Sequence, residues 1–308
     1  MSRLTCIPPR IFSDDQLRNK DIDTLKRYLT RKMGGYRVTV NDIATGNRLY
    51  RAVSWPQHRP NKIDDVSYPP REKAKLNRAN RDGIPVFYCS LAEPGVFYVL
   101  RAERGNHFAL SEWEVTEPLW MHNLGYHQDA LRRMGAPNVA MRRRLAHPIP
   151  NESKKNARLR SQLSRAFTED VRKGQEYKYK QSIAIYERMF DDAGPQPILP
   201  NGPRSTQVTG AVYPSMALGG AADNIAIWPE FVDSSLRIKS IRYVLIEAAE
   251  VSNSSYTFLT VAISQTFSGR DIIWQDDLAP ENERRRHIAL ESGNWVLRDG
   301  FNRIYDLH

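Results

Sequence analysis

Two β-rich runs near the C-terminal end of the chain limit its fold more than any other feature. Residues 236–248 (LRIKSIRYVLIEA) and 256–265 (YTFLTVAISQ) are rich in β-branched and aromatic residues. A region from about 153 to 190 shows helical spacing instead, and no regular βαβ rhythm links the two kinds of element. The sequence therefore predicts an α+β fold rather than a doubly wound parallel sheet. The expected buried face of the helical region consists of Leu159, Leu163, Phe167 and Val171.

In the rest of the chain the sequence patterns predict helices and strands less sharply. Ser13 can cap a helix and Gly34-Gly35 can end one, so a short helical segment is expected over residues 1–35. Residues 36–53 alternate around a Thr45-Gly46-Asn47 turn, which predicts a hairpin. Further helices are expected over 94–103, around 126–147 and over 153–190, the last interrupted at Gly174. Further strands are expected over 85–89, 107–115 and 225–228.

Composition limits the class of protein and the number of domains. The chain has 308 residues, 41% hydrophobic and 26% charged, which is typical of globular proteins rather than disordered or fibrous ones. At about 150 residues per domain, the length gives one large domain or two small ones. We expect a helical N-terminal segment over 1–35 and a main domain over 36–308, with a C-terminal extension after about residue 250. Two cysteines, Cys6 and Cys89, without zinc-binding spacing indicate a reducing compartment.

Charge and hydropathy indicate the surroundings of the protein. No apolar run approaches the roughly 18–20 residues that a membrane helix needs, and the N-terminus lacks the apolar core of a signal peptide. We expect a cytoplasmic protein without a membrane partner, with delivery into another cell by a signal-free route left open. The 45 Lys and Arg against 35 Asp and Glu give a net charge of +10, which suits an anionic ligand. No DNA- or RNA-reading motif accompanies this charge, so nucleic acid is not the expected partner.

Familiar catalytic motifs are absent, among them GxGxxG, GxxxxGKS/T, GxSxG and HExxH. His122 and His127 are five residues apart and do not align on one helix face, so no metal is expected. The remaining candidates for a functional site are arginines and turns of small residues. They lie in three blocks of sequence: Leu49-Tyr50-Arg51-Ala52, residues 76–89 (LNRANRDGIPVFYC) and residues 210–229 (GAVYPSMALGGAADNIAIWP).

In this order, the three blocks resemble the RES-domain family, which is named for its Arg, Glu and Ser motif residues. Tyr177 and Gln181 also fit the family's Tyr-x-x-x-Gln pattern, and the similarity runs from about residue 49 to 248. The resemblance implies a RES fold similar to that of ADP-ribosyltransferase toxins, with a short helical N-terminal segment. It further implies an NAD-degrading toxin or effector, either a glycohydrolase or a phosphorylase. NAD is then a substrate, and no cofactor is needed.

The resemblance also implies the residues of the site. Arg51 and Ser215 match the family's catalytic Arg and Ser, while Arg78, Tyr88 and Asn224 match positions expected to bind substrate. Their chemistry suits a dinucleotide. Arginines bind a pyrophosphate through charge-assisted hydrogen bonds, and hydroxyl and amide groups orient a sugar.

The family's Glu falls on Val99, which cannot replace a carboxylate. Cleavage of the nicotinamide–ribose bond builds positive charge on the ribose, and a nearby carboxylate stabilises that charge. Three neighbours could substitute. Glu103 would lie one helical turn after Val99 and is assigned to the catalytic set. Glu112 and Glu114, on one face of the next expected strand, are the alternatives.

Other functions stay open beside NAD cleavage. Because Val99 stands at the Glu position, the protein could bind NAD, ADP-ribose or a protein partner without turnover. ADP-ribosyl transfer to a macromolecule is favoured by the implied fold alone. An antitoxin or immunity protein is a partner that a toxin of this family implies, and the acceptor of the ADP-ribosyl group stays open. Two arginine runs, at 142–144 and 284–286, are expected to form solvated faces.

Overall fold

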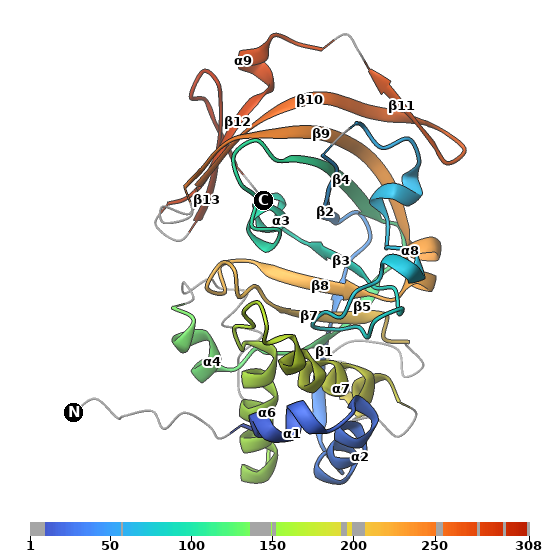
Figure 1. Ribbon diagram of the computed structural model, residues 1–308, viewed down its shortest axis with the longest axis vertical. Coiled ribbons are helices and arrows are strands. Elements are labelled where there is room, and N and C mark those ends of the chain that lie inside the picture. The colour runs from blue at the N-terminus through green and yellow to red at the C-terminus, as the bar shows by residue number, and fades with distance from the viewer. Residues whose placement is uncertain are drawn as a thin grey trace, which may run out of the picture.

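The computed structural model describes residues 10–56, 58–135, 149, 152–191, 196–198, 207–250, 255–275, 278–291 and 294–306. Within them the protein is an α+β structure built on one large, mainly antiparallel sheet (Figure 1). The helices are α1 (Asp14–Asn19), α2 (Ile22–Lys32), α3 (Glu93–Val99), α4 (Gln128–Arg133), α6 (Lys154–Phe167), α7 (Tyr179–Phe190), α8 (Pro229–Ser235) and α9 (Glu281–Arg284), with 3-10 turns η1 (Ile63–Val66), η2 (Arg71–Lys73) and η3 (Glu176–Lys178).

The strands of this sheet come from nearly the whole chain. They are β1 (Arg37–Ile43), β2 (Arg48–Ser54), β3 (Phe87–Ser90), β4 (His107–Val115), β5 (Leu119–Asn123), β6 (Gln196–Ile198), β7 (Gly210–Pro214), β8 (Asp223–Ile227), β9 (Leu236–Glu250), β10 (Ser255–Ser268), β11 (Asp271–Gln275), β12 (Arg285–Glu291), β13 (Asn294–Asp299) and β14 (Ile304–Asp306). Their order is β14-β13-β12-β10-β9-β4-β2-β3-β8-β7-β5-β1-β6, and β11 pairs with β10. The pairs β5–β7 and β1–β6 are parallel.

Three buried clusters hold the layers of the molecule together. Helices α1, α2, α6 and α7 gather under the β7–β8 half of the sheet (Figure 1), where Phe167, Tyr186 and Tyr213 are buried. A second cluster fills the opposite face of β7 and β8, against β2, β4 and β9. The third lies where α3 packs on β4, β9 and β10 around Phe97 and Phe258. Alternation along the strands places successive side chains in different clusters.

The N-terminal helices form where the sequence predicts them. Ser13 accepts a hydrogen bond from Gln16 N, and the Gln16 side chain accepts one from Ser13 N, which makes a capping box at the start of α1. Gly35 adopts a positive φ of 72° just after α2, in agreement with its predicted role at the end of a helix. Leu25 and Leu29 of α2 are buried against α7, so this segment shares a core with the rest of the protein.

The predicted hairpin over residues 36–53 is wrong in its pairing, although both strands are present. β1 pairs with β5 and β6, whereas β2 pairs with β3 and β4. The chain crosses between the two halves of the sheet at the Thr45–Asn47 turn. There Gly46 N donates to Val115 O at 2.8 Å and Val115 N to Asn47 O at 3.0 Å. Alternation identifies a strand and its faces, but the partner is set by contacts distant in sequence.

The long helical region divides as its glycine predicts, with a positive φ of 83° at Gly174 between α6 and α7. Leu159, Leu163 and Phe167 are buried as predicted. Val171 departs from the prediction because α6 ends at Phe167, and Val171 is only partly buried. Four-residue spacing cannot reveal where a helix stops. The predicted strands over 107–115 and 225–228 are confirmed as β4 and β8.

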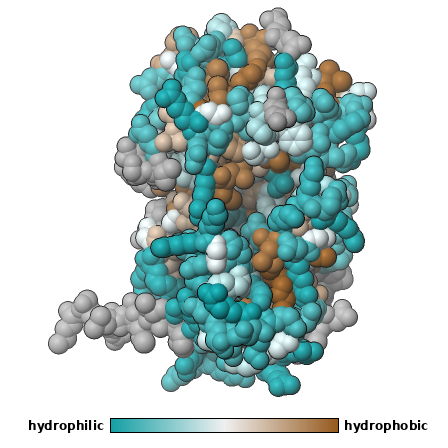
Figure 2. Space-filling view, in the orientation of Figure 1, coloured by the Kyte–Doolittle hydropathy of each residue, from teal (hydrophilic) through white to brown (hydrophobic). Residues whose placement is uncertain are grey.

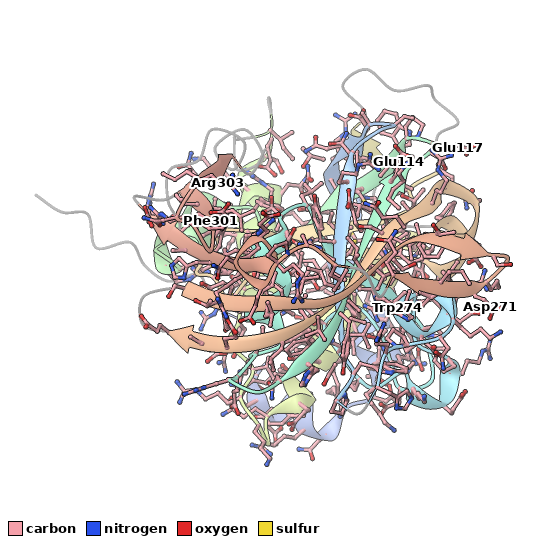
Figure 3. The ribbon with its side chains drawn as sticks, turned by 90° about the horizontal axis from the view of Figure 1, so that it is seen from above. Glu114, Glu117, Asp271, Trp274, Phe301 and Arg303 are labelled. Carbon is pink, nitrogen blue, oxygen red and sulfur yellow. The ribbon has the colours of Figure 1, made fainter. Side chains whose placement is uncertain are left out.

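The C-terminal strands reach across the molecule. Figure 3 shows Asp271 and Trp274 at one side and Phe301 and Arg303 at the other. The β10–β11 end fastens the polar loop before β3: Trp274 Nε1 donates to Pro60 O at 2.8 Å, and Lys62 pairs with Asp271 at 2.5 Å. The C-terminal strands therefore support a loop that lies more than two hundred residues earlier in the chain.

The arginine run 284–286 is built into these strands rather than forming a plain solvated face. Arg284 Nη1 donates to Thr260 O, and Arg285 binds the carboxylate of Glu247. The run at 142–144 and Cys6 lie outside the described residues. Within the described part of the chain, no helix is long and apolar enough to cross a membrane.

Burial of His122 makes the stability of the fold depend on pH. Its Nε2 lies 3.2 Å from Met189 O, and burial lowers the pKa of the imidazole to about 4. The unfolded chain binds this proton near pH 6.5, so stability is full above that pH and is lost as the pH falls from 6.5 towards 4.

We expect the protonation of His122 to lower the free energy of unfolding by about 2 kcal/mol between pH 7 and pH 5. Urea unfolding at the two pH values, followed by circular dichroism, measures this loss. A His122→Asn variant should show a smaller loss, and the exposed His58→Asn the same loss as wild type. Equal losses in all three proteins would contradict the assignment.

Candidate functional site

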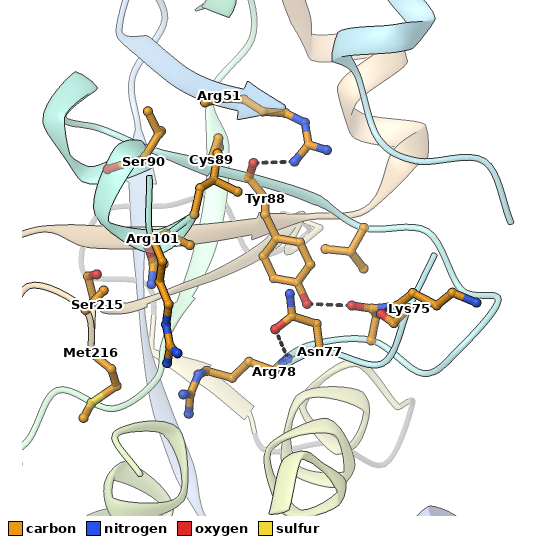
Figure 4. A pocket seen from close by; sticks show the side chains of 18 of the residues that line it. Arg51, Lys75, Asn77, Arg78, Tyr88, Cys89, Ser90, Arg101, Ser215 and Met216 are labelled. Atoms are coloured by element: carbon orange, nitrogen blue, oxygen red, sulfur yellow. Dashed lines mark hydrogen bonds between the residues drawn. The ribbon is translucent and has the colours of Figure 1, made fainter. Parts of the chain in front are cut away.

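A cavity of about 550 Å³ opens where β2, β3, β7, the end of α3 and the loop after α6 meet. Its lining includes five of the six residues assigned to the site from the sequence: Arg51, Arg78, Tyr88, Ser215 and Asn224. Figure 4 shows most of them around one opening, and Figure 2 shows hydrophobic atoms exposed between the upper and lower parts of a mostly hydrophilic face. Glu103 is not among the lining residues.

Strand register explains why three of these residues meet. Tyr213 of β7 lies opposite Asn224 of β8, and Asn224 lies opposite Ser90 of β3. Directly opposed residues share a face of the sheet, and so do residues two apart on one strand. Tyr88 therefore shares the face of Asn224, and Ser215 follows just beyond the end of β7. This face is the floor of the cavity.

Arg51 joins two segments of backbone at the edge of the cavity. Its Nε donates to Ser67 O at 2.9 Å and its Nη1 to Tyr88 O at 2.8 Å. Burial lowers the pKa of this guanidinium to about 10, so the group stays cationic at neutral pH. The side chain thus fixes the polar loop to β3.

Arg78 makes a similar connection on the other side. Its Nη1 donates to Phe167 O at 2.7 Å and its Nη2 to Glu169 O at 3.1 Å, and the residue is 8% exposed. The Glu169 carboxylate binds in turn Arg10, Lys178 and Gln181. Gln181, matched to the family pattern in the sequence, therefore supports a wall of the cavity without lining it.

The hydroxyl of Tyr88 is fully used within the protein. It donates to Asn80 Oδ1 at 2.8 Å and accepts from Ala79 N at 2.9 Å. Burial raises its pKa well above 10, and burial likewise raises the pKa of the neighbouring Cys89 thiol. Neither group supplies an anion at neutral pH, so Tyr88 presents its ring to the cavity and Cys89 is no nucleophile.

Ser215 and Asn224 carry the polar groups that a ligand can satisfy. Ser215 is 0% exposed, and its Oγ has no hydrogen-bond partner among the described residues. No described residue bonds to the side-chain amide of Asn224 either. A buried hydroxyl without a partner costs free energy, which is typical of a group reserved for a ligand.

The helix predicted over 94–103 is shorter than expected, and this removes the basis for Glu103. α3 ends at Val99, Leu100 caps it, and Arg101 turns the chain with a positive φ of 50°. Glu103 lies in the following exposed turn rather than one helical turn beyond Val99. Val99, at the family's Glu position, is 46% exposed and lines the cavity.

The alternative carboxylates, Glu112 and Glu114, lie on one face of β4 as expected, but outside the cavity lining. Arg48 pairs with both of them. Glu112 also accepts from Ser240 Oγ at 2.9 Å, and Glu114 pairs with Arg237. Both carboxylates connect β4 with its neighbours β2 and β9.

Three further lining residues were not assigned to the site from the sequence. Arg101 and Lys75 add positive charge, and Asp170 is the acidic residue of the described lining. Asp170 pairs with Arg172 at 3.4 Å through a largely exposed side chain. Asp170 follows the end of α6 in a loop whose place is set by the Arg78 and Glu169 contacts. Sequence spacing alone does not bring this loop to β3.

The electrostatic character of the cavity is positive, with Arg51, Lys75, Arg78 and Arg101 against Asp170 in the described lining. Such a lining favours an anionic ligand. Groups of three or more His, Cys, Asp or Glu side chains able to hold a metal do not occur in the described part of the chain.

Removing the Ser215 hydroxyl tests whether its Oγ lacks a hydrogen-bond partner. Ser215→Ala should raise the free energy of unfolding by about 1 kcal/mol, because it deletes a buried polar group without a partner. The matched variant is Ser90→Ala, whose Oγ donates to Asp223 O at 2.9 Å and accepts from Ala92 N. It should lower that energy by about 1 kcal/mol. Denaturant unfolding compares them, and destabilisation by Ser215→Ala would show that its Oγ has a partner.

Comparison with known proteins assigns no family to this geometry. No protein-family model matches the chain, and no curated protein matches it either. The RES resemblance therefore stays an expectation from the sequence, and the function of the cavity is inferred from its side chains.

Proposed function

We propose that the protein binds NAD in this cavity and cleaves the bond between nicotinamide and ribose. The observation that carries the proposal is the meeting of Arg51, Tyr88 and Ser215, from three distant stretches, in one positively charged cavity with Arg78 and Asn224. The RES resemblance indicates all five residues from the sequence alone. A chance surface would not gather all five.

Size and chemistry of the cavity agree with a dinucleotide. Its volume of about 550 Å³ lies within the roughly 300–1,000 Å³ usual for small-molecule sites. Tyr88, Tyr179 and Tyr213 offer aromatic surface for the bases, Asn224 offers polar groups for a ribose or an amide, and Ser215 offers a hydroxyl. The basic side chains suit the negative charge of a diphosphate.

The reaction breaks the C–N bond between ribose C1′ and the nicotinamide nitrogen. Nicotinamide leaves with the electron pair, water adds to C1′, and one proton is released, giving ADP-ribose. Positive charge builds on the ribose ring before water adds. Asp170 is the carboxylate that the described lining offers to stabilise this charge, in place of a carboxylate at Val99.

A second candidate function is binding of NAD or ADP-ribose without turnover. Val99 favours it, because an apolar side chain lines the cavity where the resembled family has its Glu. The side chain of Asp170 is also largely exposed, and solvent weakens its effect on a nearby charge.

Nicotinamide release from NAD, followed by chromatography alongside calorimetric binding, tests both candidates. We expect release by the wild type, and a loss of about 10²–10³-fold in rate for Asp170→Asn with binding preserved. Glu117→Gln, an exposed carboxylate in the turn before β5, is the matched control and should release nicotinamide at the wild-type rate.

The outcomes separate the candidates. Binding without release establishes the second function, and gain of release by Val99→Glu would then identify the missing carboxylate. If Glu103→Gln rather than Asp170→Asn abolishes release, the catalytic carboxylate is the one indicated by the sequence. Absence of both binding and release in the wild type contradicts the proposal.

A further inference from the structure

We infer that Arg101 and Ser215 form the subsite that holds the diphosphate of the ligand, while Arg51 and Arg78 serve as structural clamps. The inference deepens the proposed function and rests on it for the identity of NAD as the ligand. The chemistry of the subsite applies to any diphosphate ester.

The two arginines matched from the sequence are already engaged. Arg51 donates to two backbone carbonyls, and so does Arg78, at distances between 2.7 and 3.1 Å. Each of these contacts joins segments distant in sequence. A guanidinium turned towards a phosphate would release two carbonyls and loosen a wall of the cavity. Two of the five N–H donors of each guanidinium are thus held by backbone carbonyls, so these side chains add positive charge near the ligand but have fewer donors to offer it than Arg101.

The side chain of Arg101, unlike those of Arg51 and Arg78, is not held by backbone carbonyls of the described chain. Its side chain makes no hydrogen bond or ion pair with any described residue, and it lines the cavity. Figure 4 shows it pointing from the end of α3 towards the region of Ser215, Met216 and Arg78. Its five N–H donors remain available. A negatively charged phosphate oxygen between Arg101 and Arg78 would relieve the repulsion of the two cations.

The backbone at Arg101 supports a functional role. Its φ of 50° is left-handed, at the position after a helix cap where glycine is most common. A side chain there costs free energy that glycine would avoid. The chain thus places a long cation at a position where the backbone favours no side chain, which is characteristic of ligand sites.

Ser215 supplies the second, independent observation. Its Oγ is fully buried, lines the same cavity and has no partner among the described residues. A hydroxyl can donate to a phosphate oxygen, whereas Arg101 offers the fork that binds two such oxygens. Together they provide directed donors and charge for a diphosphate.

Arg101→Gly separates this role from folding. We expect it to weaken binding of ADP and of NAD by roughly 10- to 100-fold, the usual effect of losing charge-assisted hydrogen bonds. Its melting temperature should equal or exceed that of the wild type, because glycine accepts the left-handed backbone. Arg101→Lys, which keeps the charge but not the fork, should weaken binding less. Arg104→Ala, an exposed arginine outside the lining, is the control and should bind as wild type.

Calorimetry with ADP and with NAD distinguishes the possible failures. If Arg101→Gly and Arg101→Lys bind ADP as tightly as the wild type, or if the wild type binds no ADP, the subsite is refuted. If ADP binding depends on Arg101 but NAD does not bind, the subsite stands and the proposed function falls. If NAD binds and is cleaved equally with and without Arg101, the proposed function stands and the subsite falls.

Discussion

The hydrogen bonds from the Arg78 guanidinium to the carbonyls of Phe167 and Glu169 are the contacts on which the cavity depends. They hold the end of α6 against the loop before β3. The side chain of Glu169 extends the connection, since it binds Arg10 from the N-terminal segment and Lys178 from the η3 turn. One buried cation therefore links the floor, one wall and the outer helices, and removing it would leave one buried and one partly buried carbonyl without donors.

Arginine serves this protein in two physically different ways. Arg51 and Arg78 offset the cost of burial through hydrogen bonds to backbone oxygens, which need no opposite charge nearby. Arg101 stays in the cavity without such bonds, so its charge is available to solvent or to a ligand. A motif match identifies the position of an arginine but not its partners. The residues with the clearest signal in the sequence thus differ from the one best placed to hold an anion.

The sequence predicts most individual strands and helices, because alternation, helical spacing and capping are local properties. It does not predict that β1 and β2 separate, since pairing depends on β4 and β5, which lie more than fifty residues later. It indicates five lining residues through an ordered resemblance, yet it assigns Glu103 by assuming that α3 continues past Val99. The left-handed turn at Arg101 ends that helix, and only the fold brings Asp170 to the cavity.

The clamp of β11 on the loop around Pro60 and Lys62 has a consequence for biosynthesis. That loop carries Ser67, whose carbonyl accepts from Arg51, so one edge of the cavity is braced by residues near 275. A nascent chain on the ribosome can form the capping hydrogen bonds of its N-terminal helices early, since these bonds are local. It cannot brace this edge until the last third of the protein has been synthesised, and such long-range closure is intrinsically slow. Any activity of the cavity is therefore acquired late, after translation is nearly complete.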